Sequence, residues 1–97
     1  MTIGKLLKDL RKKKSIRQGI AAKEVGISQT WLSLIEQDKR IPSTVMLRRL
    51  SRYYNIPTPV ISWLSLSLED ISEDKKESFR RIKPTMDALI NEIFEIK

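Results

Sequence analysis

Hydrophobic residues follow a helical rhythm from the start of the chain. Ile3, Leu6, Leu7 and Leu10 lie at positions i, i+3, i+4 and i+7. This spacing predicts a first helix with one buried stripe, and Thr2 can cap its start. Apolar spacing bounded by capping residues, glycine or proline predicts three more helices at about residues 18–25, 28–37 and 43–55. Thr58-Pro59 indicates the start of a fifth helix.

Residues 18–37 have the spacing of two helices that cross at a tight turn. Ala22 leaves room for the second helix, and Gly26 can adopt the left-handed conformation that such a turn requires. The aliphatic side chains of Val25, Leu32 and Ile35 would close the angle from inside. The remaining face of the second helix is then free to contact a partner. It consists of Gln29, Thr30, Ser33, Leu34 and Gln37.

The last part of the chain has a different hydrophobic period. Apolar residues there are separated by three and four positions in turn, which is the spacing of a coiled-coil seam. They are Phe79, Ile82, Met86, Leu89, Ile93 and Ile96. Pro84 lies off this row, so the register survives, although we expect a kink or a fresh helix start near it. The seam predicts either packing onto the chain's own N-terminal domain or pairing with a second copy, and we favour the homodimer.

Positive charge is concentrated in the half of the chain that carries the crossing helices. The net charge is +7, and residues 1–54 hold 13 Lys and Arg against 4 Asp and Glu. Residues 55–97 hold 6 Lys and Arg against 8 Asp and Glu. Clustered cations beside a helix of groove size favour a polyanion, bound with an affinity that falls steeply as salt rises. We therefore expect double-stranded DNA as the partner, with the exposed helix face in its major groove.

These features resemble the lambda-repressor-like, Cro-type helix-turn-helix family, which is also called the XRE family. The resemblance covers roughly residues 2–64 and includes the 18–37 spacing, the Lys39-Arg40 loop, and Pro42-Ser43 at the start of a fourth helix. It implies an all-α fold with a compact five-helix DNA-binding domain at 1–66. The apolar row then belongs to a C-terminal amphipathic segment at 67–97, which we expect to dimerise. The alternation of apolar and polar residues at 63–68 would by itself suit a strand. The resemblance favours a helix to about residue 64 instead.

The resemblance implies which residues read bases. In this family the first two residues of the third helix, and positions about a turn further on, usually do so. They fall here at Gln29, Thr30, Ser33 and Leu34. Glutamine can pair with adenine through its donor and acceptor, and leucine or threonine methyl groups can meet the methyl of thymine.

The resemblance also implies backbone contacts and a scaffold contact. The residues expected to bind DNA phosphates are Gln18, Arg17, Lys39 and Arg40. Arg11 and Glu36 correspond to the family's structural ion pair, which ties the first helix to the third. Gln37-Asp38 departs from the usual Asn-Gly, and aspartate adopts a left-handed turn less readily than glycine.

Composition narrows the remaining function classes. With no Cys and no His, the chain has no thiolate or imidazole metal ligand and no Cys or Ser-His nucleophile pair. The acidic pairs at 69–70 and 73–74 suit helix starts rather than acid–base catalysis, so we expect no catalytic residue. We also expect no metal and no cofactor. No apolar run is long enough to span a membrane and no export signal is visible, so we expect a cytoplasmic protein without a membrane partner.

The sequence thus predicts a sequence-specific transcriptional regulator, and we favour a repressor that binds an inverted repeat as a dimer. One alternative stays open: an antitoxin-type module that neutralises a protein partner through residues 72–97 and binds DNA only to regulate its own operon. Co-purification of an unrelated chain bound through that segment would favour the alternative.

Overall fold

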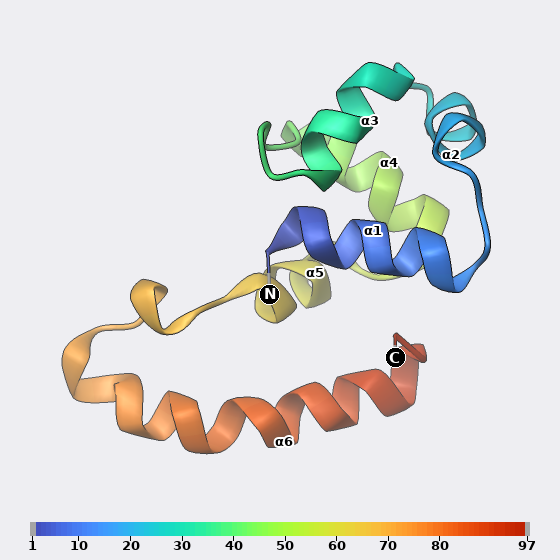
Figure 1. Cartoon of the computed structure of the whole chain (residues 1–97). Coiled ribbons are helices and arrows are strands. Elements are labelled where there is room, and N and C mark those ends of the chain that lie inside the picture. The colour runs from blue at the N-terminus through green and yellow to red at the C-terminus, as the bar shows by residue number, and fades with distance from the viewer. Residues whose placement is uncertain (1, 97) are drawn as a thin grey trace. The chain divides into compact units, whose positions relative to one another are not determined.

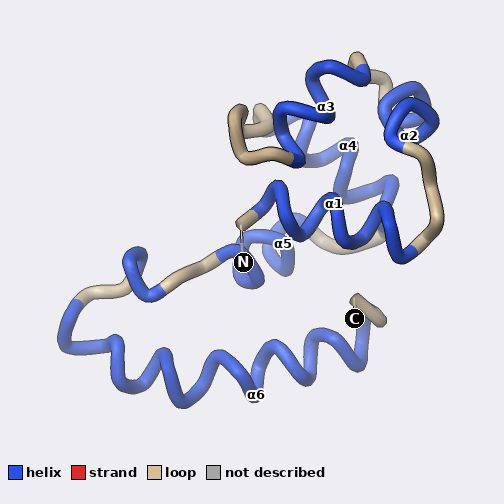
Figure 2. The backbone as a smooth tube through the Cα atoms, viewed as in Figure 1, coloured by secondary structure: helices blue, strands red, loops and turns tan. Residues whose placement is uncertain are grey.

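Every regular element in residues 2–96, the part of the chain that the computed structural model describes, is a helix (Figure 2). The all-α prediction is therefore confirmed. The chain divides into two compact units, Met1–Ser65 and Leu66–Lys97. The first unit holds five helices: α1 (Ile3–Lys13), α2 (Gln18–Val25), α3 (Gln29–Glu36), α4 (Thr44–Tyr54) and α5 (Thr58–Ser65). None of the described helices has the length and apolar composition needed to cross a membrane.

Capping side chains explain where the helices of the first unit begin. Thr2, Ser28 and Ser43 each accept a hydrogen bond from a backbone N–H three residues later, at 3.0–3.2 Å. These bonds satisfy N–H groups that have no partner within the helix. Gly26 ends α2 in the left-handed conformation, with φ 87° and ψ 32°, as the spacing predicts. The α2–α3 turn is therefore set by Gly26, which ends α2, and by Ser28, which caps α3.

The core of the first unit lies between α1 and the helices that surround it. Helix α1 packs against α3, α4 and α5, and α2 packs against α3 and α4 (Figure 1). Small residues at 21 and 22 are buried on α2, which packs against α3 and α4. The largest fully buried side chains are Leu6, Leu7, Leu32, Ile35, Leu50, Tyr54 and Ile61. This packing holds α3 on the surface of the unit with one side against the core.

The start of α1 and the turn after α3 meet at Gly4 and Asp38. A Cβ at Gly4 would overlap the carbonyl oxygen of Ile35 and lie 2.5 Å from Asp38 Oδ1, so only glycine allows this approach. Asp38 has φ 60°, and its carboxylate accepts hydrogen bonds from the Thr2 hydroxyl (2.6 Å) and the Gly4 N–H (3.1 Å). The residue that departs from the family pattern thus caps a helix distant in sequence, which compensates for its left-handed backbone.

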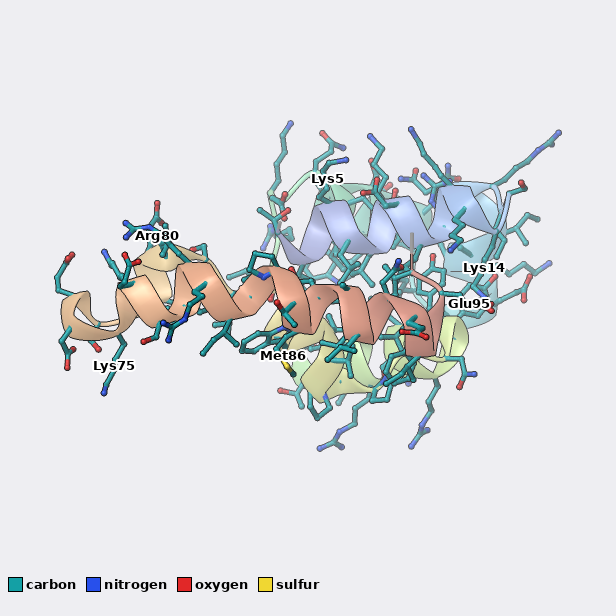
Figure 3. The ribbon with its side chains drawn as sticks, turned by 90° about the horizontal axis from the view of Figure 1, so that it is seen from below. Lys5, Lys14, Lys75, Arg80, Met86 and Glu95 are labelled. Carbon is teal, nitrogen blue, oxygen red and sulfur yellow. The ribbon has the colours of Figure 1, made fainter. Side chains whose placement is uncertain are left out.

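The second unit contains two 3-10 turns, η1 (Leu68–Asp70) and η2 (Glu73–Lys75), followed by the long helix α6 (Lys76–Phe94). Ser67 and Asp70 form a capping box at η1. The acidic pair at 69–70 therefore stands at a helix start. Figure 3 labels Lys75 before α6, Met86 within it and Glu95 after it.

Helix α6 corrects two predictions about the C-terminal segment. Pro84 lies inside a single helix, so of the two alternatives, a kink or a fresh helix start, the fresh start is wrong. Proline removes one backbone N–H, and the neighbouring hydrogen bonds carry the helix past it. Glu95 is left-handed, with φ 53°, and ends the helix. Ile96 therefore lies outside α6, and the prediction that it continues the helical apolar row is wrong.

Candidate nucleic-acid interface

Helix α3 has one side in the core and one side facing outward. Leu32 and Ile35 are at most 1% exposed, whereas Gln29 and Thr30 are exposed. Ser33 and Leu34 are half-buried, and Gln37, just after the helix, is exposed. The outward side carries an open hollow of about 310 Å³, and its lining residues are Gln18, Gln29, Thr30, Ser33 and Leu34. The structure thus brings together the four residues expected to read bases and one of those expected to bind phosphate.

The outward side of α3 is ordered by a side-chain contact of its own. The Gln37 amide donates to the Ser33 hydroxyl (2.8 Å) and to the Ser33 carbonyl (3.1 Å). Because the Ser33 oxygen accepts from Gln37, its own hydrogen remains available for an acceptor outside the protein. Ser33 therefore presents a donor on the surface that faces away from the core.

Gln18 has a structural partner that the sequence does not indicate. Its side-chain Nε2 donates to Glu36 Oε1 at 3.1 Å. The intrahelical bonds of α2 begin with the Ala21 N–H, which donates to the Arg17 carbonyl at 3.0 Å. The preceding N–H groups of α2 point out of the helix start, where they favour an anion.

Arg11 and Glu36 form a bidentate ion pair between α1 and α3. Arg11 Nε lies 2.8 Å from Glu36 Oε2, and Arg11 Nη2 lies 2.9 Å from Oε1. Arg11 Nη1 also donates to the Ile16 carbonyl at 2.9 Å, and Glu36 is only 5% exposed. The hydrogen bonds to Glu36 raise the pKa of Arg11 above its usual value. The pair, together with Gln18, locks the end of α3 to α1 and to the start of α2.

The loop after α3 is held close to that helix. The backbone N–H groups of Lys39 and Arg40 both donate to the Leu34 carbonyl, at 2.9 and 3.3 Å. The Arg40 guanidinium lies over the Trp31 ring, 5.1 Å from its centroid, and the Trp31 indole N–H faces the Met46 sulfur. Trp31 is half-buried, so its ring lies at the edge of the core and also contacts the Arg40 cation. Lys39 and Arg40 are both exposed beside the end of α3.

Cations also lie on other parts of the first unit. Arg17 is exposed at the N-cap of α2. Figure 3 labels Lys5 and Lys14 near the two ends of α1, and both are exposed. Lys5 lies 3.2 Å from Asp9, which reduces its contribution to the surrounding field. Among the cations expected to meet phosphates, Arg17 therefore stands at the start of α2, and Lys39 and Arg40 stand beyond the end of α3.

Sequence reasoning missed the contacts of three residues in this region. It assigned no role to Gly4 or Gly19, and it treated Asp38 only as a departure from the family. For Gly19 a signal was present, because a glycine inside a helix usually has a packing or functional reason. For Gly4 and Asp38 the partners lie more than thirty positions away, with separations of 34 and 36 residues in their hydrogen bonds.

Comparison with known proteins gives one family. A helix-turn-helix domain model matches residues 2–64. The ImmF control region 10 kDa protein of Bacillus phage phi105 is 36% identical over 66 residues, which cover 68% of this chain and 73% of that protein. The HTH-type transcriptional regulator ImmR of Bacillus subtilis is 33% identical over 93 residues, covering 96% of this chain and 68% of that protein. No solved structure gives a significant match. These names support a regulator and give no support to the antitoxin alternative.

Proposed function

The chain belongs to the lambda-repressor-like, XRE-type helix-turn-helix family of transcription regulators, and we propose that it is a repressor that reads double-stranded DNA through α3. The observation that carries this proposal is the hollow on the outward side of α3, lined by polar side chains and Leu34. Its base-reading residues would be Gln29, Thr30, Ser33 and Leu34. Polar donors and acceptors beside one aliphatic group suit the edges of base pairs in the major groove.

The rigid attachment of α3 supports this proposal. Base recognition requires hydrogen bonds near 3 Å, so the reading helix must be held by its neighbours. The Arg11–Glu36 pair holds the end of α3, and the Ser28 cap holds its start. The phosphate contacts would come from Gln18 and Arg17 at the start of α2 and from Lys39 and Arg40 after α3. Contacts of this kind set affinity rather than specificity.

Selection from random duplexes at two salt concentrations, followed by footprinting, tests the reading helix. The three cations Arg17, Lys39 and Arg40 predict that log K falls against log salt with a slope of about −3 per subunit. Gln29→Ala should change the selected sequence, because a glutamine can discriminate adenine through paired bonds. Ser62→Ala in α5 is the matched control and should select the wild-type sequence. An unchanged profile for Gln29→Ala would remove Gln29 from the proposed reading set.

We also propose that two chains pair through α6. Four apolar side chains on this helix are exposed: Ile82 at 46%, Met86 at 39%, Leu89 at 50% and Ile93 at 71%. They are spaced by four, three and four residues, and Phe79 precedes them in the same row. A row of this period packs well against an identical helix, which would remove the exposed apolar surface from water. A dimer would favour an inverted repeat whose half-sites lie about one helical turn apart.

Sedimentation equilibrium of the full chain tests the pairing. We expect a dimer for the wild type and a monomer for Leu89→Glu, because a carboxylate in the seam would face its own copy across the axis. Ala88→Glu places the same charge one residue earlier, off the row, and should remain a dimer. A wild-type chain that sediments as a monomer at high concentration would refute pairing through α6.

A further inference from the structure

Gly19 is an unexpected residue for its place in the fold. It is the second residue of α2, and glycine is among the poorest helix formers. Its backbone does not require glycine either, because the positive-φ glycine of the described chain is Gly26 and not Gly19. The structure points instead to the space that the missing side chain leaves.

The side-chain amide of Gln29 fills that space. A Cβ built on Gly19 would lie 3.1 Å from Gln29 Oε1, 3.5 Å from Cδ and 3.9 Å from Nε2. These are the three nearest atoms, so the Gln29 amide occupies the position that a side chain at residue 19 would approach. A contact of 3.1 Å is tighter than most contacts of a Cβ atom, so the Gln29 amide would have to give way by a few tenths of an ångström.

We propose that Gly19 is a specificity-determining residue, which positions the Gln29 amide for base recognition and does not contact DNA itself. This inference rests on the proposed function, in which Gln29 reads a base at the hollow on α3. Bidentate pairing with adenine needs both the amide oxygen and the amide nitrogen at hydrogen-bond distance in one plane. Because Gly19 has no side chain, the Gln29 amide can occupy this position before DNA binds. Preorganisation of this kind favours discrimination between bases.

The substitution Gly19→Ala separates this role from folding, because its two effects have opposite signs. Alanine is a better helix former and reduces the freedom of the unfolded chain, so the melting temperature should rise by about 4 °C. The same methyl group displaces Gln29, so recognition should deteriorate in a protein that is more stable. If Gly19 had only a general structural role, Gly19→Ala would lower stability and recognition together.

The experiment is selection from random duplexes with four full-length proteins: wild type, Gly19→Ala, Gln29→Ala and the double variant. We expect Gly19→Ala to reduce discrimination at the base pair read by Gln29 about tenfold, with the preferences at other positions retained. In the Gln29→Ala background, adding Gly19→Ala should change neither affinity nor preference, since no amide is left to displace. Melting curves of the same four proteins supply the stability readout.

Three results would overturn the inference. An unchanged selection profile for Gly19→Ala, in a protein that melts higher, would show that Gln29 adapts freely. An effect that persists in the Gln29→Ala background would show that residue 19 meets DNA directly. A wild-type protein that selects no sequence would remove the proposed function itself. That last result is distinguishable from the first two, because it precedes any comparison of variants.

Discussion

Replacing Asp38 by glycine sets two opposing effects against each other. Asp38 has φ 60°, a conformation in which glycine carries no steric penalty. Relief of this strain stabilises the folded protein by about 1 kcal/mol. The extra freedom of glycine in the unfolded chain destabilises it by roughly 0.4–1 kcal/mol. The backbone effects of Asp38→Gly therefore nearly cancel, and the lost side-chain contacts decide the result.

The contacts of the Asp38 carboxylate at the start of α1 give the larger effect. The partly buried bond from the Gly4 N–H, 3.1 Å long, is worth about 1.5 kcal/mol because its acceptor is charged. The exposed bond from the Thr2 hydroxyl, 2.6 Å long, adds about 0.5 kcal/mol. The first turn of α1 has no acidic residue of its own, so losing this negative charge costs about 0.5 kcal/mol more. We expect Asp38→Gly to lower the free energy of unfolding by about 2 kcal/mol.

Urea unfolding followed by tryptophan fluorescence measures this change, since both tryptophans, Trp31 and Trp63, lie in the first unit. Asp38→Asn is the matched control. It keeps a side-chain acceptor and tolerance of the left-handed backbone but removes the charge, so it should lose only about 1 kcal/mol. If Asp38→Gly proved as stable as the wild type, strain relief would outweigh the cap and the reasoning would be refuted.

Three further predictions concern the same unit and the same assay. Gly4→Ala should cost about 2–3 kcal/mol, because its methyl overlaps the Ile35 carbonyl, and wild-type stability would contradict the close approach. Arg11→Met should cost about 3 kcal/mol by leaving the buried Glu36 carboxylate without its bidentate partner, and a loss below about 1 kcal/mol would argue against a structural pair. Burial and the nearby Glu36 raise the pKa of Tyr54, so the folded state holds that proton more tightly than the unfolded state does. The free energy of unfolding should therefore fall above about pH 10, by up to about 1.4 kcal/mol per pH unit, and Tyr54→Phe should reduce the slope. An equal slope in that variant would assign the effect to another group.

The sequence alone was sufficient to predict the helices of the first unit. Their apolar residues recur at helical spacing, and Thr2, Ser28 and Ser43 mark three of the starts. These signals are short-ranged, because periodicity and capping involve residues only three or four positions apart. The outward side of α3 was predictable for the same reason, since the residues opposite a buried stripe must face away from the core.

The tertiary structure alone decided which of those side chains are committed to other partners. It placed the Gln18 amide on Glu36, 18 residues away, and the Asp38 carboxylate at the start of α1, 34 residues before it. It also set the Gln29 amide against Gly19. Contacts of this range depend on how whole helices pack, and a sequence pattern that repeats every few residues carries no record of that packing.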